Sequence, residues 1–84
     1  MTVEQTLAER GERYGDFAKH AAVAANLKGA MRNSPNWLKM SVVHTQALEV
    51  IADKIARVLT GDPNYADNFH DIGGYAKLVE NYIE

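Results

Sequence analysis

The sequence contains no cysteine and only two prolines among its 84 residues. The absence of cysteine excludes a disulfide scaffold and any zinc or iron–sulfur site with cysteine ligands. No apolar run approaches the roughly 20 residues needed to span a bilayer, and the N-terminus lacks the basic and apolar regions of a signal peptide. We therefore expect a cytoplasmic protein that makes no use of a membrane. The length predicts one domain, residues 1–84, because such a chain buries only about two-thirds of its unfolded surface even as a single core.

Charge is low overall but unevenly distributed. The net charge is −2, yet residues 1–39 hold six basic and four acidic groups while residues 40–84 hold three basic and seven acidic groups. Because no basic stripe is present, we do not expect binding to duplex nucleic acid. The asymmetry indicates either an anion-binding surface beside a cation site, or two halves that attract each other as they fold.

Helical periodicity and capping residues predict an all-α protein. Thr2 with Gln5 forms a capping-box pattern for a short first helix, and Asp16 is a good N-cap for a helix over residues 17–32. A third helix should run from the cap Ser41 to Gly61, and a fourth from about residue 65 to residue 82. We predict a small bundle of three to four helices, in which the long third and fourth helices form an antiparallel hairpin.

Each of the three longer helices carries an apolar stripe that is expected to face the core. The stripes consist of Phe17, His20, Ala21, Ala24, Leu27 and Met31; of His44, Ala47, Leu48, Ile51, Ile55, Val58 and Leu59; and of Tyr65, Phe69, Ile72, Ala76, Val79 and Ile83. His20 and His44 are therefore interpreted as core or interface histidines. Because the core of so short a chain is small, a homo-oligomer is expected.

Acidic residues on the third and fourth helices form a candidate Mg²⁺ site. If the two helices pack side by side, two pairs of carboxylates could flank one cleft and supply the oxygen ligands that Mg²⁺ prefers. These residues are Glu49, Asp53, Asp67 and Asp71. The alternative is ordinary helix-surface chemistry, in which Lys54 and Arg57 neutralise the carboxylates and the acids near the helix start favour its dipole.

The segment before the second helix is a candidate anion site. Arg13 and Tyr14 precede a helix N-terminus, where an arginine can grip a phosphate and a tyrosine can stack on a base. The alternative is a turn in which Gly15 supplies an unusual backbone conformation and Asp16 caps the helix.

Several segments together resemble a small phage-encoded family of unknown function. They are Glu12-Arg13-Tyr14-Gly15-Asp16-Phe17, Ala47-Leu48-Glu49, Lys54-Ile55-Ala56-Arg57, Gly61-Asp62-Pro63-Asn64-Tyr65-Ala66-Asp67, His70-Asp71-Ile72 and Gly74-Tyr75-Ala76-Lys77-Leu78. This resemblance implies a phage or prophage origin and a location in the cytoplasm of the host cell. The C-terminal half also resembles the MazG-like all-α nucleotide pyrophosphohydrolases, which hold Mg²⁺ with paired carboxylates. The pairs here are four residues apart, where that family's usual pairs are three apart.

These patterns leave three functional hypotheses. The first is a protein that binds and sequesters a phosphorylated, possibly cyclic, nucleotide signal of host anti-phage defence without a cofactor, in a pocket shared between subunits of a homo-oligomer. Its contacts would be Arg13, Tyr14, Lys54, Arg57, His70 and Tyr75. The second is Mg²⁺-dependent hydrolysis of a nucleoside triphosphate at the four carboxylates. The third is an inhibitor that binds a host protein through its acidic C-terminal surface.

Overall fold

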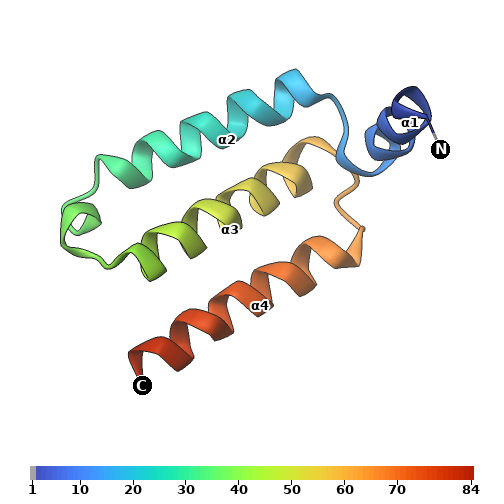
Figure 1. The fold of residues 1–84 in the computed structure, drawn as a ribbon. Coiled ribbons are helices and arrows are strands. Elements are labelled where there is room, and N and C mark those ends of the chain that lie inside the picture. The colour runs from blue at the N-terminus through green and yellow to red at the C-terminus, as the bar shows by residue number, and fades with distance from the viewer. Residues whose placement is uncertain (1) are drawn as a thin grey trace.

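The computed structural model describes residues 2–84, apart from the side chain of Tyr14, and these residues form helices and no strand (Figure 1). The elements are α1 (Val3–Tyr14), α2 (Phe17–Arg32), the short 3-10 helix η1 (Trp37–Lys39), α3 (Val42–Thr60) and α4 (Ala66–Ile83). The predicted all-α class is confirmed. None of these helices is both long and apolar enough to cross a membrane.

Side-chain caps start three of the four long helices. The Thr2 hydroxyl accepts from the Gln5 backbone N–H at 3.1 Å, and the Gln5 side chain accepts from the Thr2 N–H at 2.8 Å. Asp16 accepts from the Lys19 N–H at 3.1 Å, and Ser41 accepts from the His44 N–H at 3.3 Å. The predicted caps are confirmed. Each cap satisfies a backbone donor that has no partner inside the helix, which is why these residues predict the helix starts closely.

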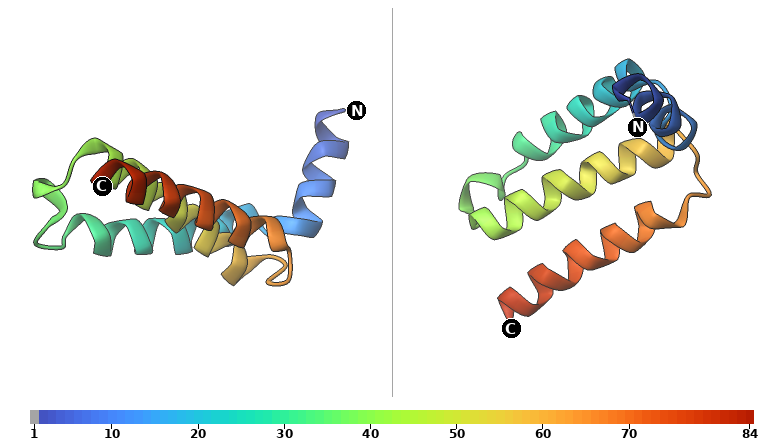
Figure 2. Two further views of the ribbon diagram at one scale, coloured as in Figure 1. Left: turned by 90° about the horizontal axis from the view of Figure 1, so that it is seen from below. Right: turned by 45° about the vertical axis from the view of Figure 1, so that its right-hand side comes forward.

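The three longest helices form a single layer with α3 in the middle. Helix α2 packs along one side of α3 and α4 along the other, each antiparallel to α3 (Figure 1). The predicted α3–α4 hairpin is therefore confirmed. Helix α1 stands across one end of the layer, beside the start of α2 and the end of α3 (Figure 2).

The corner between α1 and α2 packs directly on the end of α3. Gly15 has φ of 76°, and an added Cβ there would lie only 2.1 Å from the carbonyl oxygen of Thr60. Next to it, the backbone N–H of Asp62 donates to the carbonyl of Arg13 at 2.9 Å. Only glycine permits both this backbone conformation and this close approach. The corner therefore fixes where α1 meets the layer.

The core of the layer consists of small residues. Its buried apolar side chains are Ala24, Ala47, Ala52 and Ala56, and its largest fully buried side chain is the polar Asn68, which is 1% exposed. Larger members of the predicted core stripes are exposed: Phe17, Leu48, Ile55, Leu59, Phe69 and Ile83. For these residues the prediction of a core position is wrong in the single chain. Alanines bring the helices close together, and a single layer has no second layer to cover its faces.

Ion pairs tie the basic N-terminal half to the acidic C-terminal half. Lys28 on α2 lies 3.0 Å from Asp53 on α3, and Arg32 pairs with Glu49 one turn further along. Attraction between the two halves, one of the two interpretations of the charge asymmetry, is thus present in the fold.

Candidate functional site

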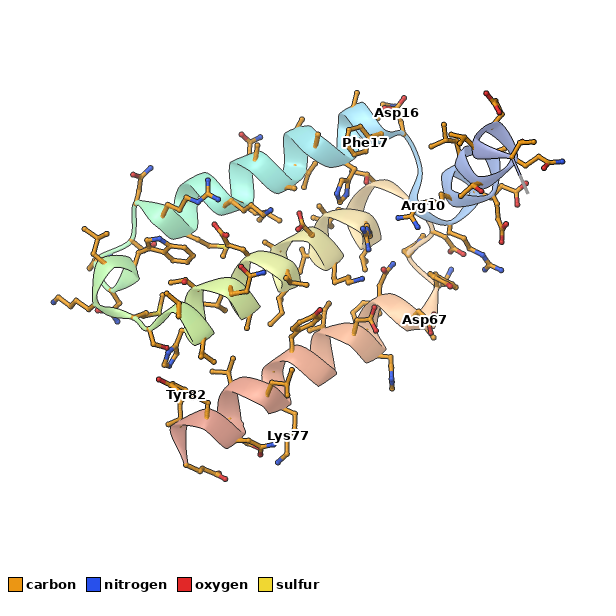
Figure 3. The ribbon with its side chains drawn as sticks, viewed as in Figure 1. Arg10, Asp16, Phe17, Asp67, Lys77 and Tyr82 are labelled. Atoms are coloured by element: carbon orange, nitrogen blue, oxygen red, sulfur yellow. The ribbon has the colours of Figure 1, made fainter. Side chains whose placement is uncertain are left out.

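A pocket lies at the corner where α1, α2 and α3 meet, and we call it the corner pocket. Figure 3 shows Arg10 on α1 and Phe17 on α2 at this end of the layer. The pocket encloses about 420 Å³, and its lining residues are Leu7, Arg10, Gly11, Gly15, Phe17, His20 and Arg57. This volume lies within the range of small-molecule sites.

The corner pocket combines positive charge with an aromatic surface. Arg10 and Arg57 reach it from different helices, and an arginine guanidinium stays charged and can bind a phosphate through two parallel hydrogen bonds. Phe17 is 81% exposed although it is a large apolar residue. Its ring lies beside that of His20, with centroids 6.2 Å apart and planes tilted by 32°. The pocket thus offers groups suited to an anion and a flat surface suited to an aromatic ring.

His20 sits in the wall of this pocket as a largely neutral imidazole. Burial lowers the pKa of His20 from its usual value of 6.5, the charges of Arg57 and Lys28 lower it further, and Asp53 opposes them. The Nδ1 atom of His20 is buried without a hydrogen-bond partner. A neutral imidazole carries one donor and one acceptor nitrogen, so His20 has hydrogen-bonding capacity that the protein leaves unused at Nδ1.

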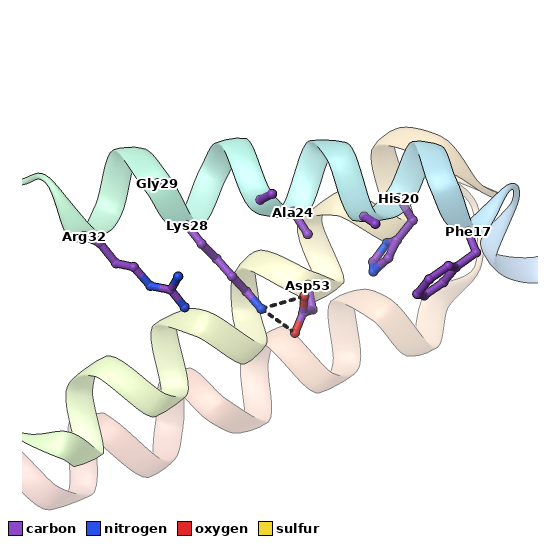
Figure 4. Close-up of a pocket in the computed structure, with 9 residues that line it drawn as sticks. Phe17, His20, Ala24, Lys28, Gly29, Arg32 and Asp53 are labelled. Atoms are coloured by element: carbon purple, nitrogen blue, oxygen red, sulfur yellow. Dashed lines mark hydrogen bonds and ion pairs between the residues drawn. The ribbon is translucent and has the colours of Figure 1, made fainter.

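A groove between α2 and α3 continues from the corner pocket, and we call it the α2–α3 groove. It shares Phe17 and His20 with the corner pocket and encloses about 410 Å³. Figure 4 shows Lys28 and Arg32 extending from α2 toward α3, with Lys28 bonded to both oxygens of Asp53. The basic residues of the groove are thus paired with α3 carboxylates, so the unequal charges of the two halves balance along this contact.

Two further cavities lie beside α4, and the larger of them is also lined by α3. One encloses about 340 Å³ and includes His70, Asp71 and Tyr75; the other encloses about 490 Å³ and is lined mainly by apolar residues such as Val42 and Leu78. Lys54 forms an ion pair with Asp71 at 3.0 Å. The hydrogen bond that Lys54 donates to Asp71 is the main reason that the pKa of the Asp71 carboxyl lies below its usual value.

The structure divides the predicted ligand contacts among three places. Arg57 lines the corner pocket, whereas the guanidinium of Arg13 lies over the ring of Tyr65, with its Cζ atom 4.7 Å from the ring centroid. His70 and Tyr75 lie in the cavity beside α4, with Lys54 paired to Asp71 nearby. The Tyr14 side chain lies outside the described part of the chain. The expected anion position at the start of α2 is taken by the Asp16 carboxylate, which caps that helix.

The predicted Mg²⁺ ligands are not brought together. Glu49 accepts from Arg32 Nε at 2.8 Å and Asp53 pairs with Lys28, so both face α2 rather than α4. Asp71 pairs with Lys54, and Asp67 accepts from the Tyr65 hydroxyl at 3.1 Å. Within residues 2–84, no three histidine, aspartate or glutamate side chains form a group that could hold a metal ion. The structure therefore does not form the single cleft that was expected to join these carboxylates. Basic residues neutralise Glu49, Asp53 and Asp71 at separate points.

The sequence did not single out most of the residues that line the corner pocket. Phe17 and His20 were expected in the core, and Arg10 was given no role. One usable signal was Gly11, because a glycine removes a side chain from one side of α1 and an added Cβ there would meet nothing within 4 Å. A cavity beside that helix is the result.

Comparison with known protein families, with curated proteins and with solved structures gives no match to this chain.

Proposed function

We propose that this protein binds a phosphorylated nucleotide in the corner pocket and holds it without catalysing a reaction. One observation carries the proposal: two arginines from different helices, an exposed phenylalanine and a half-buried histidine line one cavity of about 420 Å³. Arg10 and Arg57 would bind the phosphate, and Phe17 would stack on the base. His20 would form part of the wall beside the base.

The arrangement of the carboxylates favours binding over hydrolysis. Each acidic residue of the candidate metal set already has an ion pair or hydrogen bond, and the four lie at separate points of the layer. Magnesium-dependent attack on a phosphoanhydride needs several oxygen ligands at one point. A protein that binds a nucleotide without this machinery would return it unchanged. The resemblance to a phage-encoded family suggests that the ligand is a linear or cyclic nucleotide signal of host anti-phage defence, which the protein would sequester.

Calorimetric titration with a panel of linear and cyclic nucleotides, carried out in EDTA, tests this proposal. We expect one nucleotide per chain, recovered chemically intact after denaturation of the protein. Arg57→Ala should weaken binding about 10- to 100-fold, since hydrogen bonds to charged groups contribute about 1.5–3 kcal/mol. Phe17→Ala should weaken it about 10-fold through lost stacking.

Lys77→Ala is the matched control for the charge removed by Arg57→Ala. Lys77 lies on the far end of α4, where it pairs with Glu80, and it lines none of the cavities described above. Its removal should leave nucleotide affinity unchanged. Failure of the wild-type protein to bind any nucleotide, or equal losses in Arg57→Ala and Lys77→Ala, would contradict the corner-pocket site. Mg²⁺-dependent turnover would instead establish a hydrolase.

A further inference from the structure

One face of the three-helix layer is apolar across all three helices, and we call it the apolar face. Its α3 residues, Leu48, Ile55 and Leu59, lie about 120–160° around the helix axis from Asp53, which lines the α2–α3 groove. The same register places neighbouring apolar residues of α2 and α4 on this side, opposite Arg32 and Leu78. The apolar face therefore comprises Val23, Leu27, Ala30, Leu48, Ile55, Leu59, Phe69, Ile72, Ala76 and Ile83.

The apolar face is largely exposed, and His44 and Glu80 are the polar side chains that the same register places beside its members. Leu59 is 64% exposed, Phe69 57% and Ile83 64%. Most of its members belong to the stripes that the sequence predicts to be core, and none of the ten is polar. A soluble monomer rarely exposes a continuous apolar surface of this kind. The pattern is that of a core-forming surface that lacks its second layer.

The whole molecule, including α1 at the end of the layer, exposes more surface than a compact monomer of its mass. The chain has an accessible surface of 5,977 Å², whereas a folded monomer of 9.3 kDa is expected to have about 5,000 Å². Its radius of gyration is 14.4 Å, compared with about 12 Å for a compact domain of this length. The excess of about 1,000 Å² is close to the roughly 800 Å² that each partner buries in a stable complex.

We propose that a second copy of this chain packs on the apolar face, giving a two-fold symmetric dimer of two three-helix layers. In such an interface the same surface meets itself, and a face lined mainly by apolar side chains brings few like charges together. The packing would also supply the large buried apolar side chains that the single chain lacks, since its largest fully buried residue is Asn68. The corner pocket, which contains Arg57 on the opposite face of α3, would stay open in each copy.

Sedimentation equilibrium or light scattering on Leu59→Glu tests the proposal. The wild-type protein should have twice the 9.3 kDa mass of the chain. Leu59→Glu should weaken association on the order of 100-fold, because a two-fold interface would bury two new charges. Leu78→Glu is the matched control: Leu78 is 62% exposed but lies on the opposite face, so this variant should remain a dimer.

A cross-linking experiment keeps the test independent of folding stability. Because the chain has no cysteine, Ile55→Cys and Leu78→Cys each introduce a single thiol. A short bis-maleimide linker should join two copies of Ile55→Cys and leave Leu78→Cys unlinked. A wild-type protein that is monomeric in solution would overturn the proposal. The proposal would also be overturned if this monomer bound lipid vesicles through the apolar face. Preferential linking of Leu78→Cys would overturn it as well.

Discussion

The two faces of the layer are built from the same helices but differ in chemistry. The charged face carries the α2–α3 groove, with Lys28 and Arg32 paired to α3 carboxylates, and leads to the arginines of the corner pocket. The apolar face is lined mainly by apolar side chains, with His44 and Glu80 at the end of the layer where α3 begins and α4 ends. One thin layer can thus present the proposed ligand site and the proposed dimer surface on opposite sides. Each can therefore be changed while the other is kept.

We expect Gly15→Ala to destabilise the protein more than any other substitution considered. Gly15 lies in the corner between α1 and α2, which packs on the end of α3. The new Cβ would lie 2.1 Å from the Thr60 carbonyl oxygen at a φ of 76°. We expect a loss of roughly 3 kcal/mol or more in the free energy of unfolding, from steric overlap and backbone strain together. A thermal melt should show a drop of about 15 °C or more.

Gly73→Ala is the control for the glycine substitution. A Cβ at Gly73 meets nothing within 4 Å, and the residue lies inside α4. The substitution should stabilise the helix by up to about 1 kcal/mol. If both variants melt at similar temperatures, the close approach of the α1–α2 corner to α3 is wrong. At temperatures where Gly15→Ala stays folded, nucleotide binding should fall while the dimer mass is kept, because the apolar face has no part in the corner.

A double-mutant cycle on Lys28 and Asp53 measures how much their ion pair stabilises the contact between α2 and α3 on the charged face. The two side chains are 22% and 34% exposed, so solvent screens them less than a fully exposed pair. With Lys28→Ala, Asp53→Ala and the double variant, urea unfolding should give a coupling free energy of about 1 kcal/mol.

The same cycle on Lys77 and Glu80 provides the comparison. This pair lies three residues apart on α4 and is more than half exposed on both sides. Its coupling should be about 0.3 kcal/mol and should vanish in high salt. Equal couplings for the two pairs would mean that attraction between the two halves contributes nothing beyond ordinary surface charge.

The smallest effect that we expect is a pH dependence of the free energy of unfolding that arises from His20. Burial lowers the pKa of His20 below 6.5, with Arg57 and Lys28 adding to the shift and Asp53 opposing it. As the pH falls below 6.5, the unfolded chain therefore takes up a proton before the folded chain does. The stability associated with neutral His20 is complete above pH 6.5 and is lost as the pH falls through the folded-state pKa.

Urea unfolding of the wild-type protein and His20→Gln between about pH 7.5 and pH 5 checks this expectation. The free energy of unfolding should fall more steeply for the wild-type protein than for the variant. The two proteins differ only at residue 20, so a difference between their curves reports on His20. A parallel decline of the two proteins would show that His20 titrates alike in the folded and unfolded states.

Local sequence signals were enough to predict the helices. Thr2, Asp16 and Ser41 cap helices because their side chains satisfy backbone donors within three residues, which requires no knowledge of the rest of the fold. The turn after Gly61 is short, so it predicts an antiparallel α3–α4 pair. These signals lie close together in the sequence, and the structure contains both the helix starts and the antiparallel pair that they predict.

The site and the layer depend on information that periodicity does not contain. A helical pattern shows that Glu49 and Asp53 share a face, but it does not show which neighbouring helix they meet; they meet α2 through Arg32 and Lys28. Likewise, the stripe containing Leu48 and Leu59 indicates a surface that packs against something. Whether the partner is the same chain or a second copy cannot be read from a single helix.

Native mass spectrometry of the protein with a bound nucleotide tests the separation of the two faces most directly, because it counts chains and ligands in one species. We predict a complex of two chains carrying two nucleotides, with Leu59→Glu giving one chain and one nucleotide. A dimer that holds a single nucleotide shared between its chains, or a single chain that binds none, would contradict the account.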